Sequence, residues 1–481
     1  MKTSGVLLPI FSLPSPYGIG TIGKSAYEFA DYLAASGAKI WQVLPLGPTG
    51  YGDSPYQSFS SFAGNPYFID PDFLRRDGFL RKADLPEKIS EGEKINYGAI
   101  FHSRADMLEK AFDFSYEKIK DEVASFAQSR PDIKDYAVFM AIKETHGGIG
   151  RQDFPQGLRL HRKSSVEAFE KTHTKRINYH LFVQYLFFKY WRELKKYVNS
   201  LGIKILGDMP IYVAPDSSDA WANYRNFQLD AERTSSLVAG VPPDYFSEDG
   251  QKWGNPLYNW KYLKNHGYAF WISRMRAAAE LFDIVRLDHF IGFANYYSTS
   301  ADAPTARDGF WRDGPGISLF RAISEACPDL TLVAEDLGVV SEKVKRLMKK
   351  TGFPAMRALQ FAFGGDEDNI HLPENFSENT LLYTGTHDNP TTKAWWESAS
   401  EEEKRCCAEY IGKKSPKMPR DLISFALASK ADTVIIPMWD ILALGAEGRV
   451  NSPGTSEGNW TWRIRSVPKK PYVLSRDKTS T

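Results

Sequence analysis

Short apolar runs recur along the chain and alternate with amphipathic stretches, a pattern typical of an α/β protein. Such runs, without alternating polar positions, indicate parallel strands that are buried on both faces. Eight strands are predicted, at residues 5–9, 39–44, 203–208, 284–288, 330–335, 358–363, 380–384 and 433–437. Helical spacing predicts helices that include residues 25–35, 179–200, 268–281, 317–326 and 341–350. Eight alternating strands favour a closed (β/α)8 TIM barrel over an open sheet.

Two long segments interrupt the alternation of strands and helices. Residues 47–175 follow the second strand and combine Gly/Pro/Ser-rich loops with charged helical stretches, so we expect an inserted, mainly helical subdomain. Residues 210–264 are rich in Pro, Asp, Tyr and Trp. Long loops are usually functional or disordered, and the density of aromatic residues argues against disorder. We therefore expect residues 210–264 to form an inserted active-site loop region within one catalytic barrel that spans residues 1–481.

Charge and cysteine content narrow the class of protein. The chain has 60 Lys and Arg against 59 Asp and Glu, which gives a net charge of +1. It therefore has no strong positive electrostatic field that would attract nucleic acid or an anionic membrane. Asp440 interrupts the best candidate for a membrane-spanning stretch. Three cysteines, of which Cys406 and Cys407 are adjacent, give no disulfide framework. We expect a cytoplasmic protein that acts without nucleic acid, membrane or cofactor.

Four of the predicted strands lead into a carboxylate. These carboxylates are Asp208, Asp288, Glu335 and Asp388. The C-terminal ends of the strands are where a TIM barrel carries its chemistry. Several carboxylates at that place indicate chemistry on a glycosidic bond, which an acid and a nucleophile cleave as a pair. Three of them also have an ordinary alternative, because Asp288 could form a structural ion pair and Glu335 or Asp388 could cap a helix.

The residue types at these positions predict different roles. Arg286 lies two residues before Asp288, so both side chains point to one face of the strand, and the positive charge favours an ionised nucleophile. Glu335 has the longer side chain that suits a general acid and base, and we expect neighbouring negative charge to raise its pKa. Asp388 could hold two hydroxyl groups of a sugar ring and favour its distorted form, and His387 could donate to another hydroxyl.

Two other kinds of site compete with this interpretation. His289 and His387 could join the acids in binding a metal ion, but no His-x-x-x-His or His-x-His spacing is present. His289 directly follows Asp288, so on a strand it would point to the opposite face. Residues 18–23 fit the dinucleotide pattern G-x-G-x-x-G, but the next strand lacks the acid that binds ribose. We therefore expect a glycine-rich first barrel loop and no metal site.

Ordered motifs run along nearly the whole chain, and the most specific are residues 15–20, 41–49, 51–58, 285–290, 333–338, 386–389, 449–455 and 458–460. These motifs resemble those of glycoside hydrolase family 77, the 4-α-glucanotransferases. The resemblance implies a barrel related to the α-amylases, with insertions in place of their C-terminal β-domain. It also implies that an α-1,4-glucan segment moves from a donor maltooligosaccharide to the 4-hydroxyl of an acceptor glucan or glucose.

The resemblance further implies a role for each matching residue. Asp288 would be the nucleophile, Glu335 the acid and base, and Asp388 the stabiliser of the transition state. The residues expected to contact glucan or to stand beside these three are Tyr51, Ser54, Tyr56, Asp208, Trp253, Asn255, Arg286, His387 and Asn459. A retaining double displacement through a covalent Asp288 intermediate requires carboxyl groups about 5–5.5 Å apart.

Three other functions remain open at this point. An α-amylase-type hydrolase of α-1,4-glucans would give only shortened products, and a binding module derived from the fold would give none. A nicotinamide oxidoreductase would need a cofactor site, which the second strand argues against. The expected partners are maltooligosaccharides and other α-1,4-glucans, with glucose as an acceptor, and the sequence leaves the oligomeric state open.

Overall fold

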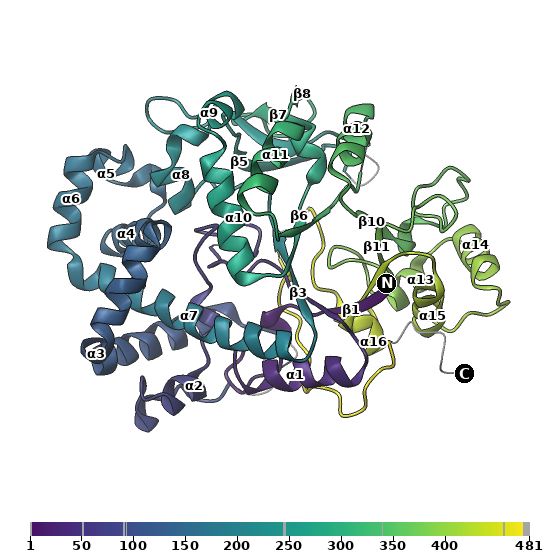
Figure 1. Ribbon diagram of the computed structural model, residues 1–481, viewed down its shortest axis with the longest axis horizontal. Coiled ribbons are helices and arrows are strands. Elements are labelled where there is room, and N and C mark those ends of the chain that lie inside the picture. The colour runs from purple at the N-terminus through teal and green to yellow at the C-terminus, as the bar shows by residue number, and fades with distance from the viewer. Residues whose placement is uncertain are drawn as a thin grey trace.

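Eight parallel strands close into a barrel at the centre of the molecule (Figure 1). The computed structural model describes residues 2–50, 52–89, 92, 94–243, 247–338, 340–455 and 457–474. The barrel strands, in chain order, are β1 (Thr3–Leu7), β2 (Ile40–Gln42), β3 (Lys204–Met209), β6 (Ile284–Leu287), β9 (Thr331–Ala334), β10 (Ala355–Ala358), β11 (Thr380–Tyr383) and β12 (Thr433–Pro437). The strand order around the barrel is β1-β12-β11-β10-β9-β6-β3-β2, which confirms the predicted TIM barrel.

The barrel strands are continuously apolar because both of their faces are covered. All residues of β2, β6 and β11 are buried, as expected for parallel strands enclosed by helices. The parallel register also positions polar groups, since it places Asp208 of β3 directly beside Arg286 of β6. Strand pairing alone therefore places the carboxylate-bearing Asp208 next to the positively charged Arg286.

Helices cover the outside of the barrel, as the apolar spacing predicts. They include α1 (Lys24–Ala35), α7 (Thr174–Ser200), α10 (Ala269–Leu281), α11 (Ile317–Ala326), α12 (Glu342–Thr351), α13 (Thr392–Ser398), α14 (Glu401–Ile411), α15 (Arg420–Ala428) and α16 (Met438–Ile441). The glycine-rich residues 18–23 form the turn before α1, whose N-cap is Gly23. At Gly20 a Cβ atom would lie 1.9 Å from the main-chain oxygen of Ile10, so this turn requires glycine. The dinucleotide-like pattern is thus a barrel loop.

The segment between β2 and β3 is largely helical. It contains α2 (Pro71–Arg76), α3 (Tyr97–Ser129), α4 (Pro131–Thr145), α5 (Gln156–Arg159) and α6 (Lys163–Thr172). These helices lie together on one side of the barrel (blue, left in Figure 1). They pack on α7 through aromatic residues such as Phe112 and Phe182, whose ring centroids are 5.5 Å apart. The division of residues 47–175 into a separate subdomain stays a prediction.

The segment predicted as a long loop contains regular structure, so that part of the prediction is wrong. Residues 210–264 include α8 (Ser218–Ala222), β4 (Leu237–Val241), β5 (Gln251–Pro256) and α9 (Trp260–Asn265). The strands join β7 (Asn295–Ser300) and β8 (Phe310–Asp313) in an antiparallel sheet of order β5-β4-β7-β8. Sequence pattern missed it because β4 and β5 are paired through a register shift and β7 is distant in sequence.

The sixth barrel strand begins earlier than predicted. It spans Ala355–Ala358, whereas the apolar run at residues 358–363 continues into a 3-10 turn at Leu359–Phe361. The carboxylate of Asp336 accepts the main-chain N–H of Met356 at 2.9 Å and so fixes the start of the strand. The prediction is wrong because an apolar run does not by itself distinguish a buried strand from a buried turn.

The C-terminal segment returns across the barrel instead of forming a further sheet. The N–H of Trp460 donates to the oxygen of Val450 at 2.7 Å, and that of Ile464 donates to the oxygen of Ser12 at 2.9 Å. Within the described part of residues 449–474 there is no strand of a C-terminal β-domain, in agreement with the prediction. Among the helices of the described residues, none combines the length and apolar character needed to cross a bilayer.

Candidate active site

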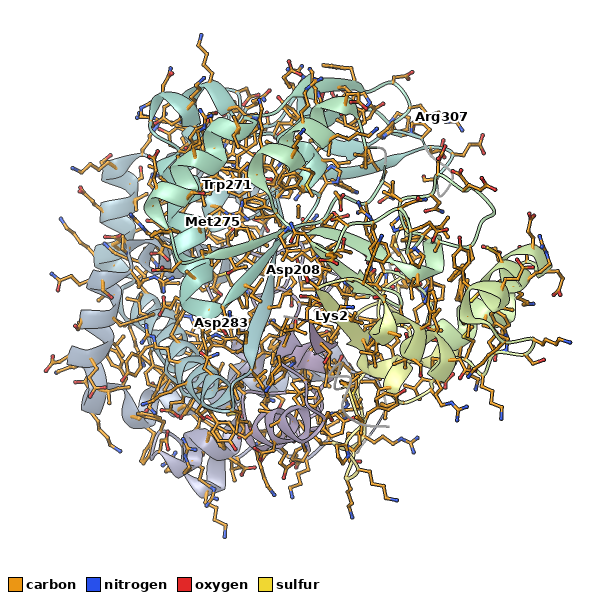
Figure 2. All side chains as sticks on the ribbon, turned by 45° about the vertical axis from the view of Figure 1, so that its right-hand side comes forward. Lys2, Asp208, Trp271, Met275, Asp283 and Arg307 are labelled. Atoms are coloured by element: carbon orange, nitrogen blue, oxygen red, sulfur yellow. The ribbon has the colours of Figure 1, made fainter. Side chains whose placement is uncertain are left out.

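The predicted acids lie at the C-terminal mouth of the barrel. Asp208 lies within β3, Asp288 directly follows β6, and Glu335 directly follows β9. His387 and Asp388 lie in the turn after β11 rather than at its last residue. Figure 2 shows Asp208 close to the point where the barrel strands converge. The barrel therefore gathers side chains that are far apart in the sequence.

Arg286 connects two of these carboxylates. Its Nη1 donates to the two carboxylate oxygens of Asp208 at 2.7 and 2.6 Å and to Oδ1 of Asp288 at 2.9 Å. The predicted common face of Arg286 and Asp288 is therefore confirmed. The side chain of Asp208 is fully buried, while that of Asp288 is 27% exposed. Asp208 thus anchors Arg286 from behind, and Asp288 remains open to a ligand.

Tyr56 extends this network to His387. The Tyr56 hydroxyl donates to Oδ2 of Asp208 at 2.7 Å, and the same oxygen lies 2.9 Å from Nε2 of His387. Because the Tyr56 proton is directed to Asp208, Nε2–H of His387 donates to the Tyr56 oxygen in this arrangement. The two rings stack with centroids 5.4 Å apart, and Trp460 packs against both. Burial lowers the pKa of His387, which keeps the imidazole neutral.

Asp388 is partly exposed to solvent, and residues outside the barrel strands contact its carboxylate. Nδ2 of Asn451 donates to its Oδ1 at 2.6 Å, and Nε2 of His387 lies 3.4 Å from its Oδ2. The Asp388 side chain is 43% exposed. The N-cap of the next helix, α13, is Thr391, so the alternative of a helix-capping Asp388 is wrong. Asn451 was not predicted as a site residue, although it lies in the matching stretch at residues 449–455.

Glu335 is held by the main chain on both oxygens. The N–H of His289 donates to its Oε2 at 2.7 Å, and the N–H of Leu337 donates to its Oε1 at 2.9 Å. Burial raises the pKa of Glu335 to about 7, against the opposing effects of Arg286 and of these two hydrogen bonds. The predicted effect of neighbouring negative charge is present, since Asp336 raises the pKa of Glu335, but burial is the larger cause. The N-cap of α12 is Ser341, so Glu335 is not a helix cap.

Asp288 has a perturbed pKa, and Glu335 is one of the groups that affect it. Burial raises the pKa of Asp288 above its usual range, Arg286 opposes that rise, and the surrounding carboxylates add to it. The predicted lowering by Arg286 is present but is outweighed by burial. The N–H of His289, the residue after Asp288, donates to the Glu335 carboxylate, so the turn after β6 contacts the acid that follows β9. The predicted separation of the two carboxyl groups, about 5–5.5 Å, stays a prediction.

The remaining candidates lie around this centre in different environments. Asn255 is buried and braces the loop, since its Nδ2 donates to the oxygen of Val213 at 2.8 Å. Trp253 packs perpendicular to His289 with ring centroids 4.8 Å apart. Ser54 accepts the N–H of Tyr56 through its Oγ at 3.3 Å. These contacts leave their predicted binding of glucan as a prediction.

Two further predictions concern the rim of the site. Oδ1 of Asn459 accepts the N–H of Ser452 at 2.9 Å, and its Nδ2 donates to the oxygen of Thr455 at 3.0 Å. Asn459 therefore stabilises the turn that follows Asn451. Tyr51 lies outside the described residues.

The geometry of His289 differs from the strand-based expectation. The prediction that it faces away from Asp288 assumed a continuing strand, but β6 ends at Leu287 and His289 has φ 51°. Strand alternation therefore does not apply to it. In the described part of the chain, no group of three or more His, Cys, Asp or Glu side chains is arranged to hold a metal ion.

Replacing Glu335 with Gln is expected to stabilise the folded protein at pH 8 but not at pH 4. The folded-state pKa of about 7 lies above the ordinary value of 4.5, so the folded state binds the proton more tightly. Stability is therefore lost as pH rises from about 4.5 to 7, by about 3 kcal/mol in total, and Gln avoids this loss. Urea unfolding at both pH values measures the difference. A stability gap between variant and wild type that is the same at both pH values would contradict the assignment.

Comparisons with known proteins find similarity over nearly the whole chain. The family model for 4-alpha-glucanotransferases of glycoside hydrolase family 77 matches residues 8–468. The 4-alpha-glucanotransferase of Clostridium butyricum is 45% identical over 484 residues, covering 97% of this chain and 98% of that protein. The 4-alpha-glucanotransferase of Thermus thermophilus is 43% identical over 476 residues, covering 96% of this chain and 95% of that protein.

Solved structures show the same likeness. The amylomaltase of Streptococcus agalactiae, solved in complex with acarbose, superimposes with a TM-score of 0.93 at 40% identity, covering 97% of this chain and 95% of that one. The amylomaltase of Corynebacterium glutamicum shares the fold, with a TM-score of 0.75 at 18% identity over 96% of this chain and 71% of that one.

Proposed function

Because the chain belongs to the 4-alpha-glucanotransferase family, glycoside hydrolase family 77, we propose that it transfers α-1,4-glucan segments from a donor maltooligosaccharide to the 4-hydroxyl of an acceptor glucan or glucose. The observation that carries this proposal is the paired environment of two acids. Asp288 is partly exposed against Arg286, and Glu335 is buried with a pKa of about 7. These are the environments that a nucleophile and a general acid need.

In the first step Asp288 attacks the anomeric carbon of the donor. The glycosidic bond breaks, and Glu335 gives its proton to the departing 4-oxygen, which leaves as a shortened glucan with a free hydroxyl. A covalent bond now joins the donor segment to Asp288 with inverted configuration. The pKa of Glu335 supports this role, since a large fraction of the carboxyl is protonated near neutral pH.

In the second step an acceptor sugar takes the place of the leaving group. Glu335 is now ionised and removes the proton of the acceptor 4-hydroxyl, whose oxygen displaces Asp288 from the anomeric carbon. The second inversion restores the α-configuration and frees both acids in their starting states. The reaction consumes no water, because one glycosidic bond replaces another.

The residues around the two acids would orient and stabilise the reacting sugar. Asp388, held by Asn451, offers a partly exposed carboxylate to ring hydroxyls and to positive charge that develops at the anomeric carbon. Arg286 favours the ionised form of Asp288, because its charge opposes the rise in pKa that burial causes. Asp208 and Tyr56 act as positioning residues, because they touch Arg286 and His387 from the buried side.

Transfer prevails over hydrolysis when the acceptor sugar is bound well and water is excluded. The half-buried ring of Trp253, which packs against His289, supports this preference because a flat aromatic face can pack on a sugar. The alternative, an α-amylase-type hydrolase, uses the same pair of acids, so it is distinguished by products rather than by the acids. The family membership favours transfer.

We also propose a reducing, cytoplasmic location. The three cysteines are free, with Cys407 buried and Cys327 and Cys406 half-buried. Disulfides are rare in reducing compartments, which supports the proposal. Measuring where the tagged protein fractionates in its cell of origin tests it.

Incubation with maltotriose is expected to yield glucose and longer maltooligosaccharides together. Each transfer leaves the number of reducing ends unchanged, whereas each hydrolysis adds one. Chromatographic sizing of products combined with a reducing-end assay therefore separates the two reactions. Reducing ends that increase in step with product, with only shortened chains, would refute transfer in favour of hydrolysis.

A further inference from the structure

His289 carries a buried polar atom that its surroundings leave unsatisfied. Its side chain lies next to the nucleophile in the chain, and the residue is 9% exposed. Its Nε2 is shielded from solvent, and no hydrogen-bond partner for it exists among the described residues. A buried polar atom without a partner is destabilising, so its presence beside two catalytic acids calls for a physical reason.

The main chain fixes where this imidazole lies. The N–H of His289 donates to Oε2 of Glu335 at 2.7 Å, and the N–H of Phe290 donates to the oxygen of Glu335 at 2.9 Å. His289 also has φ 51°, a left-handed conformation that is uncommon for residues other than glycine. The residue is therefore attached to the general acid on one side and to the nucleophile on the other.

The ring is enclosed by two neighbours. A Cβ atom on Gly292 would lie 3.1 Å from Cδ2 of His289, so the imidazole is already close to the main chain behind it. On another side the Trp253 ring meets it at 84°, with centroids 4.8 Å apart. Trp253 is only half-buried, so this side of the imidazole is covered by a side chain that itself reaches the surface.

The imidazole is neutral under the conditions of catalysis. Burial lowers the pKa of His289 to about 4, so the ring has one N–H donor and one acceptor nitrogen near neutral pH. A neutral group of this kind can bind a hydroxyl without altering the charge that Glu335 needs. Sugar sites combine such polar groups with aromatic rings, and Trp253 supplies the ring here.

We propose that Nε2 of His289 hydrogen-bonds a hydroxyl group of the acceptor sugar and so helps the acceptor to compete with water. This inference rests on the proposed transferase function. The acceptor occupies the place of the leaving group, on the side of the scissile bond where Glu335 exchanges its proton. The main-chain N–H of His289 donates to Glu335, so the residue lies next to the group that exchanges this proton. The bound hydroxyl would satisfy the buried nitrogen and align the 4-hydroxyl with Glu335.

Monodeoxy acceptors test this assignment directly. A maltooligosaccharide donor is held at a fixed saturating concentration, and transfer is measured onto glucose and onto glucose analogues that each lack one hydroxyl other than the 4-hydroxyl. In the wild type, removal of the hydroxyl that His289 binds is expected to lower acceptor kcat/KM by about tenfold. The His289→Phe variant should show that loss already with glucose, and removal of the same hydroxyl should then have no further effect.

A matched control comes from another histidine in the same setting. His161 also has a left-handed φ, 53°, and packs on a tryptophan, Trp221, with ring centroids 4.4 Å apart, but it lies between α5 and α6 in the helical insertion. The His161→Phe variant is expected to keep the wild-type acceptor profile. The His289→Gln variant retains a hydrogen-bonding group, so we expect it to recover part of the discrimination that His289→Phe loses.

The outcomes separate this inference from the function on which it rests. A wild-type enzyme that transfers to no acceptor at all would refute the proposed transferase. Transfer by the wild type, combined with the same monodeoxy profile in folded His289→Phe and His289→Gln variants, would overturn only the role of His289. Loss of the penalty for one particular hydroxyl in His289→Phe, but not in His161→Phe, supports it.

Discussion

Replacing Asp288 with Asn is expected to abolish transfer and hydrolysis together, by about 10⁴-fold or more, the size of loss typical when a covalent catalyst loses its nucleophile. The amide keeps the shape of the side chain and removes the charge that attacks the anomeric carbon. Both reactions pass through the same covalent intermediate, so both should fall equally. Product sizing with maltotriose measures transfer, and a reducing-end assay measures hydrolysis.

A matched variant separates this effect from general damage. Asp313 is an exposed carboxylate at the last residue of β8, and it pairs with Lys343 of α12. We therefore expect Asp313→Asn to retain full activity. Thermal unfolding should find the Asp288→Asn variant folded, because Asp208 still holds Arg286 from behind. A folded Asp288→Asn enzyme with near-normal activity would refute the assignment of the nucleophile.

Replacing Glu335 with Gln is expected to lower kcat/KM on maltotriose by about 10²–10⁴-fold and to remove one limb of its pH profile. The first step needs a protonated Glu335, whose pKa is about 7, so wild-type activity should fall as pH rises above 7. Activity should also fall at low pH, where Asp288 gains a proton and can no longer attack. Gln does not titrate, so only the acidic limb should remain in the variant.

The pH profile of kcat/KM from about pH 4 to 9 tests this expectation. A donor with a leaving group that needs no proton, such as a glycosyl fluoride, provides the control. Its first step should be nearly as fast in Glu335→Gln as in the wild type, because acid assistance is not required. A variant that keeps the alkaline limb near pH 7 would assign that limb to a different group.

The barrel and its acids could be predicted because buried parallel strands leave a plain pattern. Their apolar runs need no partner to be recognised, and a polar residue at the end of such a run stands out. Asp288 and Glu335 directly follow β6 and β9, as expected. The spacing of Arg286 and Asp288 predicted their contact, which the structure has at 2.9 Å. Local pattern thus predicted that these side chains meet at the mouth of the barrel.

Features that depend on distant contacts could not be predicted in this way. The sheet β5-β4-β7-β8 requires pairing between residues 237–241 and 295–300, and no local pattern specifies that register. The contact of Asn451 with Asp388 depends on the path of the C-terminal segment. Burial, the main cause of the raised pKa of Glu335, also follows from the whole fold rather than from neighbouring charges.

The two aspartates that Arg286 contacts are buried to different extents, and this difference separates their electrostatic roles. Asp208 is fully buried and satisfied by Arg286 and Tyr56, so it fixes the geometry without facing the ligand. Asp288 shares the same arginine and remains 27% exposed, so it can react. Arg286 therefore pairs with one fully buried and one partly exposed carboxylate, and the catalytic role of Asp288 stays a proposal.

The most direct test of the central claim is to trap the covalent intermediate. Glu335→Gln is mixed with a glycosyl fluoride of a maltooligosaccharide, which can form the intermediate without an acid but cannot resolve it without a base. Peptide mapping by mass spectrometry then locates the added glycosyl mass. We predict that it lies on the peptide that contains Asp288 and that Asp288→Asn in the same background carries none. A glycosyl adduct on another residue, or release of β-configured product without any adduct, would contradict a retaining transfer through Asp288.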